Sequence, residues 1–244
     1  MMKVVSLVPS LTELLLYLGV EVVGRTKFCI HPAAEIGAIP KVGGTKTVHT
    51  DQVVALEPDL VIANKEENVA EQVGALQEAG LQVLVTDIKD YDTALAAIDT
   101  IGAAVGRTSQ ARLLVADIER AFQSLPQAGL SVCYLIWRKP YMTIGGDTYI
   151  HDMLTRCGYT NVYQSQERYP EVTLEELQSR RPDVVMLSSE PFPFAEKHIA
   201  ELQEAMPDST VVLVDGEYFS WYGSRMVAAA KYFRTLYSDH KIKT

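Results

Sequence analysis

Aromatic and cationic side chains gather in a few short stretches of this sequence, in a pattern that suits a large, flat, partly apolar ligand. The stretches WRKPYM, SSEPFPF and DGEYFSWYGS are much richer in aromatic residues than the chain as a whole, where such residues make up 8%. Aromatic rings stack on flat ligands, and nearby Lys and Arg side chains can meet carboxylates, phosphates or amide oxygens.

We predict ligand-binding residues in these stretches and in polar stretches of the first half. The first-half candidates are Ser10, Lys27, Phe28, His31, Thr45, Lys46, Asn64 and Lys65. The second-half candidates are Trp137, Arg138, Tyr141, Glu190, Phe192, Tyr218, Trp221 and Tyr222, with Arg225 as a further cation. For Trp137 and Trp221 core packing is the alternative, because each stands where an apolar strand or helix begins. For Arg225 the alternative is an ion pair on a helix surface.

The sequence contains no recognisable pattern for catalysis or for a metal site. The five histidines show no HxH or HExxH spacing, although His31 and His49 remain possible ligands of a chelated metal. Ser188, Ser189 and Ser224 lack a GxSxG context, and the three cysteines form no CxxC pair. We therefore expect no catalytic residues, no metal site and no resident cofactor. An α/β enzyme of chelatase or reductase type remains an alternative.

A repeat relates the two halves of the chain. Residues 57–66 read EPDLVIANKE and residues 181–190 read RPDVVMLSSE, so a Pro-Asp pair recurs 124 positions later. At the same offset Asp51 corresponds to Glu175. Such a repeat predicts two similar lobes.

The elements that must position these residues alternate between apolar strands and helices. Strands are expected over 3–8, 59–63, 82–87, 131–137, 183–188 and 210–215. Helices are expected over 11–19, 50–56, 67–79, 148–158, 172–180, 195–205 and 221–237. Ser10 with Glu13 reads as a capping box, and Asp147 as the cap of the helix that follows it. Continuous apolar strands separated by helices predict parallel sheets covered on both faces.

Between the two alternating regions, residues 90–127 are helical without a strand. A helix over 108–125 would be about 27 Å long at 1.5 Å per residue, enough to join two lobes. We predict an α/β fold of two Rossmann-like lobes, 1–89 and 128–244, with parallel sheets, connected once, through this helical linker. Because ligands of open α/β sheets lie outside the carboxyl ends of the strands, the candidate loops should line a cleft between the lobes. Trp137, Tyr141, Trp221 and Tyr222 are expected on one wall and Phe28, His31, Thr45 and Lys65 on the other, partly exposed without ligand.

Charge and hydropathy restrict the partners and the location. A net charge of −9 argues against nucleic acid or an anionic membrane as the main partner, and no apolar run is long enough for a membrane span. The opening MMKVVSLVPS lacks the pattern of a signal peptide, which predicts a cytoplasmic protein. The alternative is a periplasmic or cell-surface protein whose signal has been removed.

The spans VVSLVPSLTELLLYLG, VGGT, LEPDLVIAN and VTLEELQSRRPDVVMLSS resemble the helical-backbone (class III) substrate-binding proteins of ABC importers. The resemblance covers nearly the whole chain. It implies capture of a corrinoid such as cobalamin, a haem-like compound or a ferric siderophore by a monomer, and delivery to a permease dimer. It also implies that Asp51 and Glu175 meet permease arginines, although the family usually has Glu on the first lobe. A cytoplasmic carrier or sensor on the same fold is the alternative function.

Overall fold

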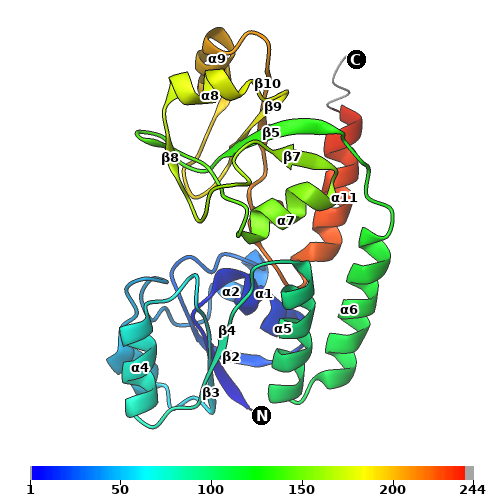
Figure 1. Cartoon of the computed structure of the whole chain (residues 1–244). Helices are drawn as coiled ribbons and strands as arrows, with labels where there is room; N and C mark the ends of the chain where they lie inside the picture. The colour runs from blue at the N-terminus through cyan, green and yellow to red at the C-terminus, as the bar shows by residue number, and fades with distance from the viewer. Residues whose placement is uncertain (1, 240–244) are drawn as a thin grey trace. The chain divides into compact units, whose positions relative to one another are not determined.

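The computed structural model describes residues 2–239, and in it the chain forms two compact units with parallel sheets. The strands of the first unit are β1 (Lys3–Ser6), β2 (Glu21–Arg25), β3 (Leu60–Asn64) and β4 (Val83–Thr86). Its helices are α1 (Pro9–Tyr17), α2 (Ala33–Ile36), α3 (Thr50–Ala55), α4 (Ala70–Glu78), most of α5 (Tyr91–Ala104) and most of α6 (Thr108–Phe122). Figure 1 shows these strands and helices in blue to green.

The second unit repeats this plan. Its strands are β5 (Leu130–Leu135), β6 (Tyr141–Met142), β7 (Tyr159–Asn161), β8 (Glu171–Val172), β9 (Val184–Ser188) and β10 (Thr210–Val214). Its helices are α7 (Tyr149–Arg156), α8 (Leu174–Arg180), α9 (Glu196–Ala205), α10 (Glu217–Ser220) and most of α11 (Arg225–Asp239). The main sheets have the orders β2-β1-β3-β4 and β7-β5-β9-β10, with every pairing parallel, and β6 and β8 form a separate antiparallel pair. The predicted parallel α/β units are therefore present.

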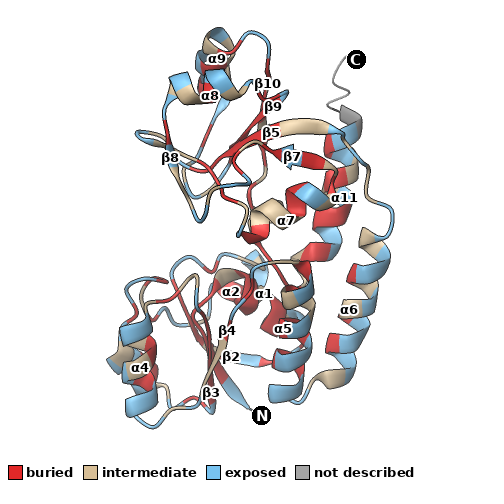
Figure 2. Ribbon diagram, viewed as in Figure 1, coloured by how far each residue is buried: buried red, intermediate tan, exposed pale blue. Residues whose placement is uncertain are grey.

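Each sheet has a buried centre, because its central strands are apolar on both faces. Every residue of β3 and of β9 is buried, and Figure 2 shows these strands in red. Val5, Val61 and Leu76 belong to the core of the first unit, and Leu135 and Leu187 to that of the second. Helices covering both faces of a parallel sheet produce this burial.

The repeated Pro-Asp pair has the same structural role in both units. The Asp59 carboxylate accepts a hydrogen bond from the Lys3 backbone N–H at 2.7 Å, at the start of β1. The Asp183 carboxylate accepts from the Ser131 backbone N–H at 2.7 Å and from the Ser131 hydroxyl at 2.6 Å, near the start of β5. These bonds hold the pKa of Asp183 below its ordinary value. The aspartate of each repeat thus fastens the beginning of the central strand.

The units divide the chain differently from the expected 1–89, 90–127 and 128–244. Residues 92–120 and 221–227 belong to the first unit, while residues 89–91 belong to the second, so the chain passes between the units at more than one place. Residues 92–120 are joined to the first unit by Arg107, whose guanidinium donates to the carbonyls of Leu18 at 3.1 Å and Gly19 at 3.2 Å. Residues 89–91 are joined to the second unit by Tyr91, whose backbone N–H donates to the Asp152 carboxylate at 2.8 Å. The expected residues 240–244 lie outside the described part of the chain.

Several element boundaries also differ from the expectation. Helix α1 has no side-chain cap: Val8 is its N-cap and Pro9 occupies the first turn, so Ser10 and Glu13 do not form a capping box. Thr148, not Asp147, caps α7 by accepting from the backbone N–H of His151. Helix α6 ends at Phe122, which makes it about 22 Å long rather than about 27 Å. The helix expected over 221–237 begins at Arg225 instead.

Candidate ligand-binding and docking sites

The loop after β2 presents two exposed apolar side chains on a rigid base. Buried Arg25 donates three hydrogen bonds to backbone carbonyls around the loop, the one to Cys29 at 3.0 Å. Phe28 is 52% exposed, Ile30 is also exposed, and the Lys27 ammonium lies 5.0 Å from the centre of the Phe28 ring. A rigid loop that exposes a ring beside a cation can stack on a ligand with little loss of entropy on binding.

The other strand-end groups of the first unit divide into buried and exposed residues. Ser10, Thr45 and Asn64 are buried, so these candidates do not form an open surface. The Asn64 side chain accepts from the backbone N–H of Glu66 at 2.8 Å and donates to the Thr86 hydroxyl at 3.0 Å. Its chemistry is therefore used to shape the loop after β3.

In the second unit, Ser188 stands 124 positions after Asn64 and bonds in the same way to the loop that follows its strand. Ser188 accepts from the backbone N–H of Glu190 at 3.3 Å and donates to the Glu190 carbonyl at 2.6 Å. The Glu190 carboxylate in turn accepts from the Ser220 hydroxyl at 2.6 Å. Ser188, like Asn64, thus shapes the loop that follows its strand.

Two exposed lysines of the first unit have partners within it. The Lys65 ammonium lies 2.8 Å from the Asp87 carboxylate. The Lys46 ammonium donates to the backbone carbonyl of Glu66 at 2.5 Å. Both cations are placed at the carboxyl ends of the strands as expected, with part of their hydrogen-bonding capacity already used.

The expectation that Trp221 and Tyr222 form an exposed wall of the second lobe is wrong. Both belong to the first unit and both are buried, Trp221 being 7% exposed. The Arg225 guanidinium lies 4.7 Å from the Trp221 ring, and the His31 ring meets Trp221 edge-on at 5.5 Å. The packing alternative for Trp221 is therefore the one the structure supports.

Arg225 is held by Glu13, which was predicted to belong to a capping box. Its Nε and Nη2 donate to the two carboxylate oxygens of Glu13 at 2.9 and 2.8 Å. This paired geometry is the strong arrangement for a guanidinium and a carboxylate. It anchors residues 221–227 in the first unit, and no local pattern could reveal a pair separated by 212 positions.

The loops of the second unit expose a second aromatic surface. Trp137 is 40% exposed and packs edge-on against Phe192 at 5.8 Å. Phe192 packs in turn on Phe194 at 4.8 Å and on the buried ring of His198 at 5.5 Å. Trp137 thus combines an exposed face with a fixed orientation.

The remaining candidates of the second unit are tied to neighbours. Arg138 donates through Nη2 to both carboxylate oxygens of Glu201 at 2.6 Å, and Tyr141 donates to Glu201 at 3.4 Å. Tyr218 stacks on Tyr232 with ring centres 4.6 Å apart. Glu201 carries no motif that would have predicted this contact.

Asp51 and Glu175 occupy equivalent positions, each at the second residue of a helix. Asp51 lies in α3 and Glu175 in α8, and both are exposed. The Glu175 backbone N–H and the Thr173 hydroxyl hold the pKa of the Glu175 carboxyl below its ordinary value, so it is ionised at neutral pH. An exposed, ionised carboxylate at this position can pair with a cation of another molecule.

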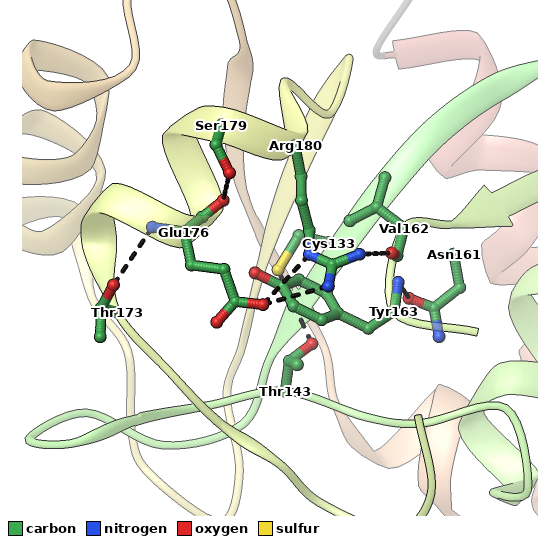
Figure 3. Close-up of polar contacts among 9 residues, drawn as sticks. All are labelled: Cys133, Thr143, Asn161, Val162, Tyr163, Thr173, Glu176, Ser179 and Arg180. Atoms are coloured by element: carbon green, nitrogen blue, oxygen red, sulfur yellow. Dashed lines mark hydrogen bonds and ion pairs between the residues drawn. The ribbon is translucent and has the colours of Figure 1, made fainter. Parts of the chain in front are cut away.

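Helix α8 is fixed by contacts on its inner side, as Figure 3 shows. Thr173 caps it by accepting from the backbone N–H of Glu176 at 3.1 Å. The Arg180 guanidinium donates to Glu176 and to the carbonyl of Val162, and lies 4.2 Å from the Tyr163 ring. The helix therefore presents Glu175 from a rigid support.

Two kinds of feature are absent from residues 2–239. No helix in this range has the length and apolar character needed to cross a membrane. The same range contains no group of three or more His, Cys, Asp or Glu side chains placed to hold a metal ion.

Two similar α/β units whose strand-end loops carry aromatic and cationic side chains are typical of a ligand-binding protein. The chain belongs to the periplasmic binding protein family, whose model matches residues 4–210. The predicted relationship and fold class are thereby confirmed. This family consists of binding proteins rather than enzymes, which agrees with the absence of a predicted catalytic site.

Individual relatives extend the comparison. The chain is 24% identical over 235 residues to a vitamin B12-binding protein of Salmonella typhimurium, covering 94% of this chain and 87% of the relative. It is 28% identical over 198 residues to YvrC of Bacillus subtilis, an uncharacterized ABC transporter substrate-binding lipoprotein, covering 75% of this chain and 62% of the relative.

Solved structures share the fold. The periplasmic haem-binding protein BhuT, solved with two haems, superposes with a TM-score of 0.83 at 23% identity, covering 97% and 98% of the two chains. The periplasmic vitamin B12-binding protein BtuF of Vibrio cholerae has a TM-score of 0.78 at 18% identity, covering 99% and 98%. The family description and the name of the lipoprotein YvrC support the periplasmic or cell-surface alternative and not the predicted cytoplasmic location.

Proposed function

We propose that this protein captures a metal chelate, either a corrinoid, a haem-like compound or a ferric siderophore, and delivers it to the permease of an ABC importer. The family match over residues 4–210 carries this proposal. It is supported by relatives whose names include vitamin B12 and haem. The proposed location is periplasmic or cell-surface, and the proposed ligand is a transported cargo rather than a resident cofactor.

Phe28 and Trp137 are the proposed stacking residues. Each is a large exposed ring fixed by its neighbours, and each stands in a loop that follows a strand of a parallel sheet. Ligands of such sheets bind outside the carboxyl ends of the strands. Stacking on an aromatic ring contributes about 1 kcal/mol beyond the buried area.

A thermal-shift screen with cobalamin, cobinamide, haemin and ferric siderophores tests the ligand class. A ligand at 100 times its dissociation constant should add about 2.7 kcal/mol to the free energy of unfolding. Titration of Phe28→Ala and Trp137→Ala with the best ligand should then give weaker binding, by about fivefold or more. Tyr17→Ala is the matched control, because Tyr17 is an exposed ring at the end of α1, away from the strand-end loops. If no compound raises the melting temperature, the proposed ligand class is wrong.

For delivery, we propose that Asp51 and Glu175 bind arginines of a permease dimer. Two exposed carboxylates at matched positions of a duplicated fold suit a partner with two-fold symmetry. Charge reversal to Lys at either position should reduce ligand uptake in vesicles that contain the permease, without changing ligand affinity. Glu78→Lys is the control, since Glu78 is an exposed acid at the end of α4. Equal uptake by all variants would contradict the docking role.

A further inference from the structure

Arg138 is a strand-end cation whose charge is already matched inside the protein. It follows β5, and its side chain is 19% exposed. Its Nη2 donates to both carboxylate oxygens of Glu201 at 2.6 Å, while its Nε is buried and has no hydrogen-bond partner among the described residues. The charge of the guanidinium is thus matched by Glu201, while these two bonds occupy only Nη2 of its three nitrogens.

Glu201 is well placed to stay ionised beside Arg138. The hydrogen bond from Arg138 is the main cause that holds the pKa of the Glu201 carboxyl below its ordinary value. The Tyr141 hydroxyl supplies a further donor to the same carboxylate at 3.4 Å. Half of the Glu201 side chain, 49%, remains exposed, so its negative charge faces anything that approaches Arg138 from solvent.

The exposed ring of Trp137 immediately precedes this pair. Phe192 connects the Trp137 ring to this pair: its ring centre lies 5.8 Å from that of Trp137 and 5.5 Å from that of His198, and His198 is close enough to Arg138 and Glu201 to interact with both charges. A flat ligand stacked on Trp137 would therefore bring its peripheral groups into the neighbourhood of Arg138 and Glu201. A carboxylate there would have to displace Glu201 or lie beside a like charge, which costs binding energy. A neutral amide or ester oxygen would meet no such repulsion and would still find a donor in the guanidinium.

We propose that Glu201 is a specificity residue that selects against ligands with peripheral carboxylates and in favour of ligands with amide or other neutral side groups. This inference rests on the proposed function and deepens it, because it assigns a chemical preference to the same site. Discrimination by an unfavourable charge placed against the wrong ligand is a common source of binding specificity.

Two pairs of ligands that differ chiefly in these groups provide the test. Cobinamide and cobyrinic acid share a corrin ring, with amides on the first and carboxylates on the second. Haemin dimethyl ester and haemin share a porphyrin, with esters on the first and carboxylates on the second. Dissociation constants are measured by absorbance titration for the wild type, Glu201→Gln and Glu204→Gln. Glu204 is an exposed acid of the same helix, so its variant makes the same change in net charge away from Arg138.

For at least one pair, the wild type should bind the neutral member more tightly. Glu201→Gln should tighten binding of the carboxylate member about tenfold and change that of the neutral member less than threefold, whereas Glu204→Gln should change neither selectively. The gain should shrink at high salt. Equal changes for both members, or the same change in Glu204→Gln, would overturn the inference alone. If neither pair binds the wild type or Glu201→Gln, the inference fails, whereas the proposed chelate-binding function fails only if the ferric siderophores of the thermal-shift screen also do not bind.

Discussion

The ion pair between Glu13 and Arg225 should be the main fastening of residues 221–227 to the first unit. The side chains are 19% and 11% exposed, respectively, and the two hydrogen bonds measure 2.8 and 2.9 Å. An exposed pair contributes about 0.5 kcal/mol, and breaking a fully buried one by removing a single partner costs about 3–5 kcal/mol. For this partly buried pair we expect Glu13→Gln to lower the free energy of unfolding by about 2 kcal/mol.

A double-mutant cycle isolates the pair from other effects of each substitution. The variants are Glu13→Gln, Arg225→Met and the double variant, in a Trp137→Phe background where Trp221 is the remaining tryptophan. Urea unfolding followed by tryptophan fluorescence reports on Trp221 directly, because Arg225 lies on its ring. We expect a coupling energy of about 1–2 kcal/mol.

The control for this cycle is a solvent-exposed ion pair. Asp117 and Arg120 lie 2.8 Å apart on α6, with side chains 47% and 72% exposed. Asp117→Asn should change the free energy of unfolding by no more than about 0.5 kcal/mol. A coupling between Glu13 and Arg225 as small as this value would refute the anchoring argument, and the burial of Trp221 would then have to come from apolar packing alone.

Three further predictions concern other parts of the molecule. Because the pKa of Asp183 is lowered in the folded state, its ionised form stabilises the protein at neutral pH, and this stabilisation is lost as pH falls through the folded pKa. In urea unfolding, Asp183→Asn should therefore lose less stability than the wild type between pH 7 and pH 3. Parallel plots of stability against pH for the two proteins would contradict this prediction. Burial raises the pKa of the Cys133 thiol to about 12, so iodoacetamide at pH 8 should modify this thiol only after unfolding. Rapid labelling of Cys133 in the native protein, located by mass spectrometry, would show that the thiol is accessible and contradict this. Acrylamide should quench Trp137 and spare Trp221, so Trp137→Phe should remove most of the quenchable fluorescence, and unchanged quenching would mean that Trp137 is covered in solution.

Local pattern predicted those parts of the fold that depend on short-range chemistry. The apolar runs predicted strands such as β3 and β9, because strands buried on both faces must be apolar throughout. The Pro-Asp repeat predicted two similar units, and the reason is now visible in the carboxylates of Asp59 and Asp183, which fasten the central strands. The exposed positions of Phe28 and Trp137 also follow from their place in strand-end loops.

The errors arose where distant segments meet. Trp221 was predicted to lie at the start of a helix of the second lobe. The chain instead returns to the first unit at this point, and the Trp221 ring is buried with Arg225 over its face. Glu13 had the spacing of a capping box, yet Pro9 already supplies the helix start and leaves the carboxylate free for Arg225. Contacts of this kind depend on tertiary arrangement, which spacing in a single sequence does not encode.

The two units therefore separate stability from recognition. Asp59 and Asp183 act in the same way in both units, at the amino ends of the central strands, where a ligand is not expected to bind. The loops at the opposite ends differ: the first unit exposes Phe28 beside a lysine, and the second exposes Trp137 next to Arg138, whose charge is matched by Glu201. Because the shared frame does not depend on those loops, their side chains can change the chemistry of recognition at little cost to folding. That independence is the reason a charge such as Glu201, half exposed on its helix, can serve selection rather than stability.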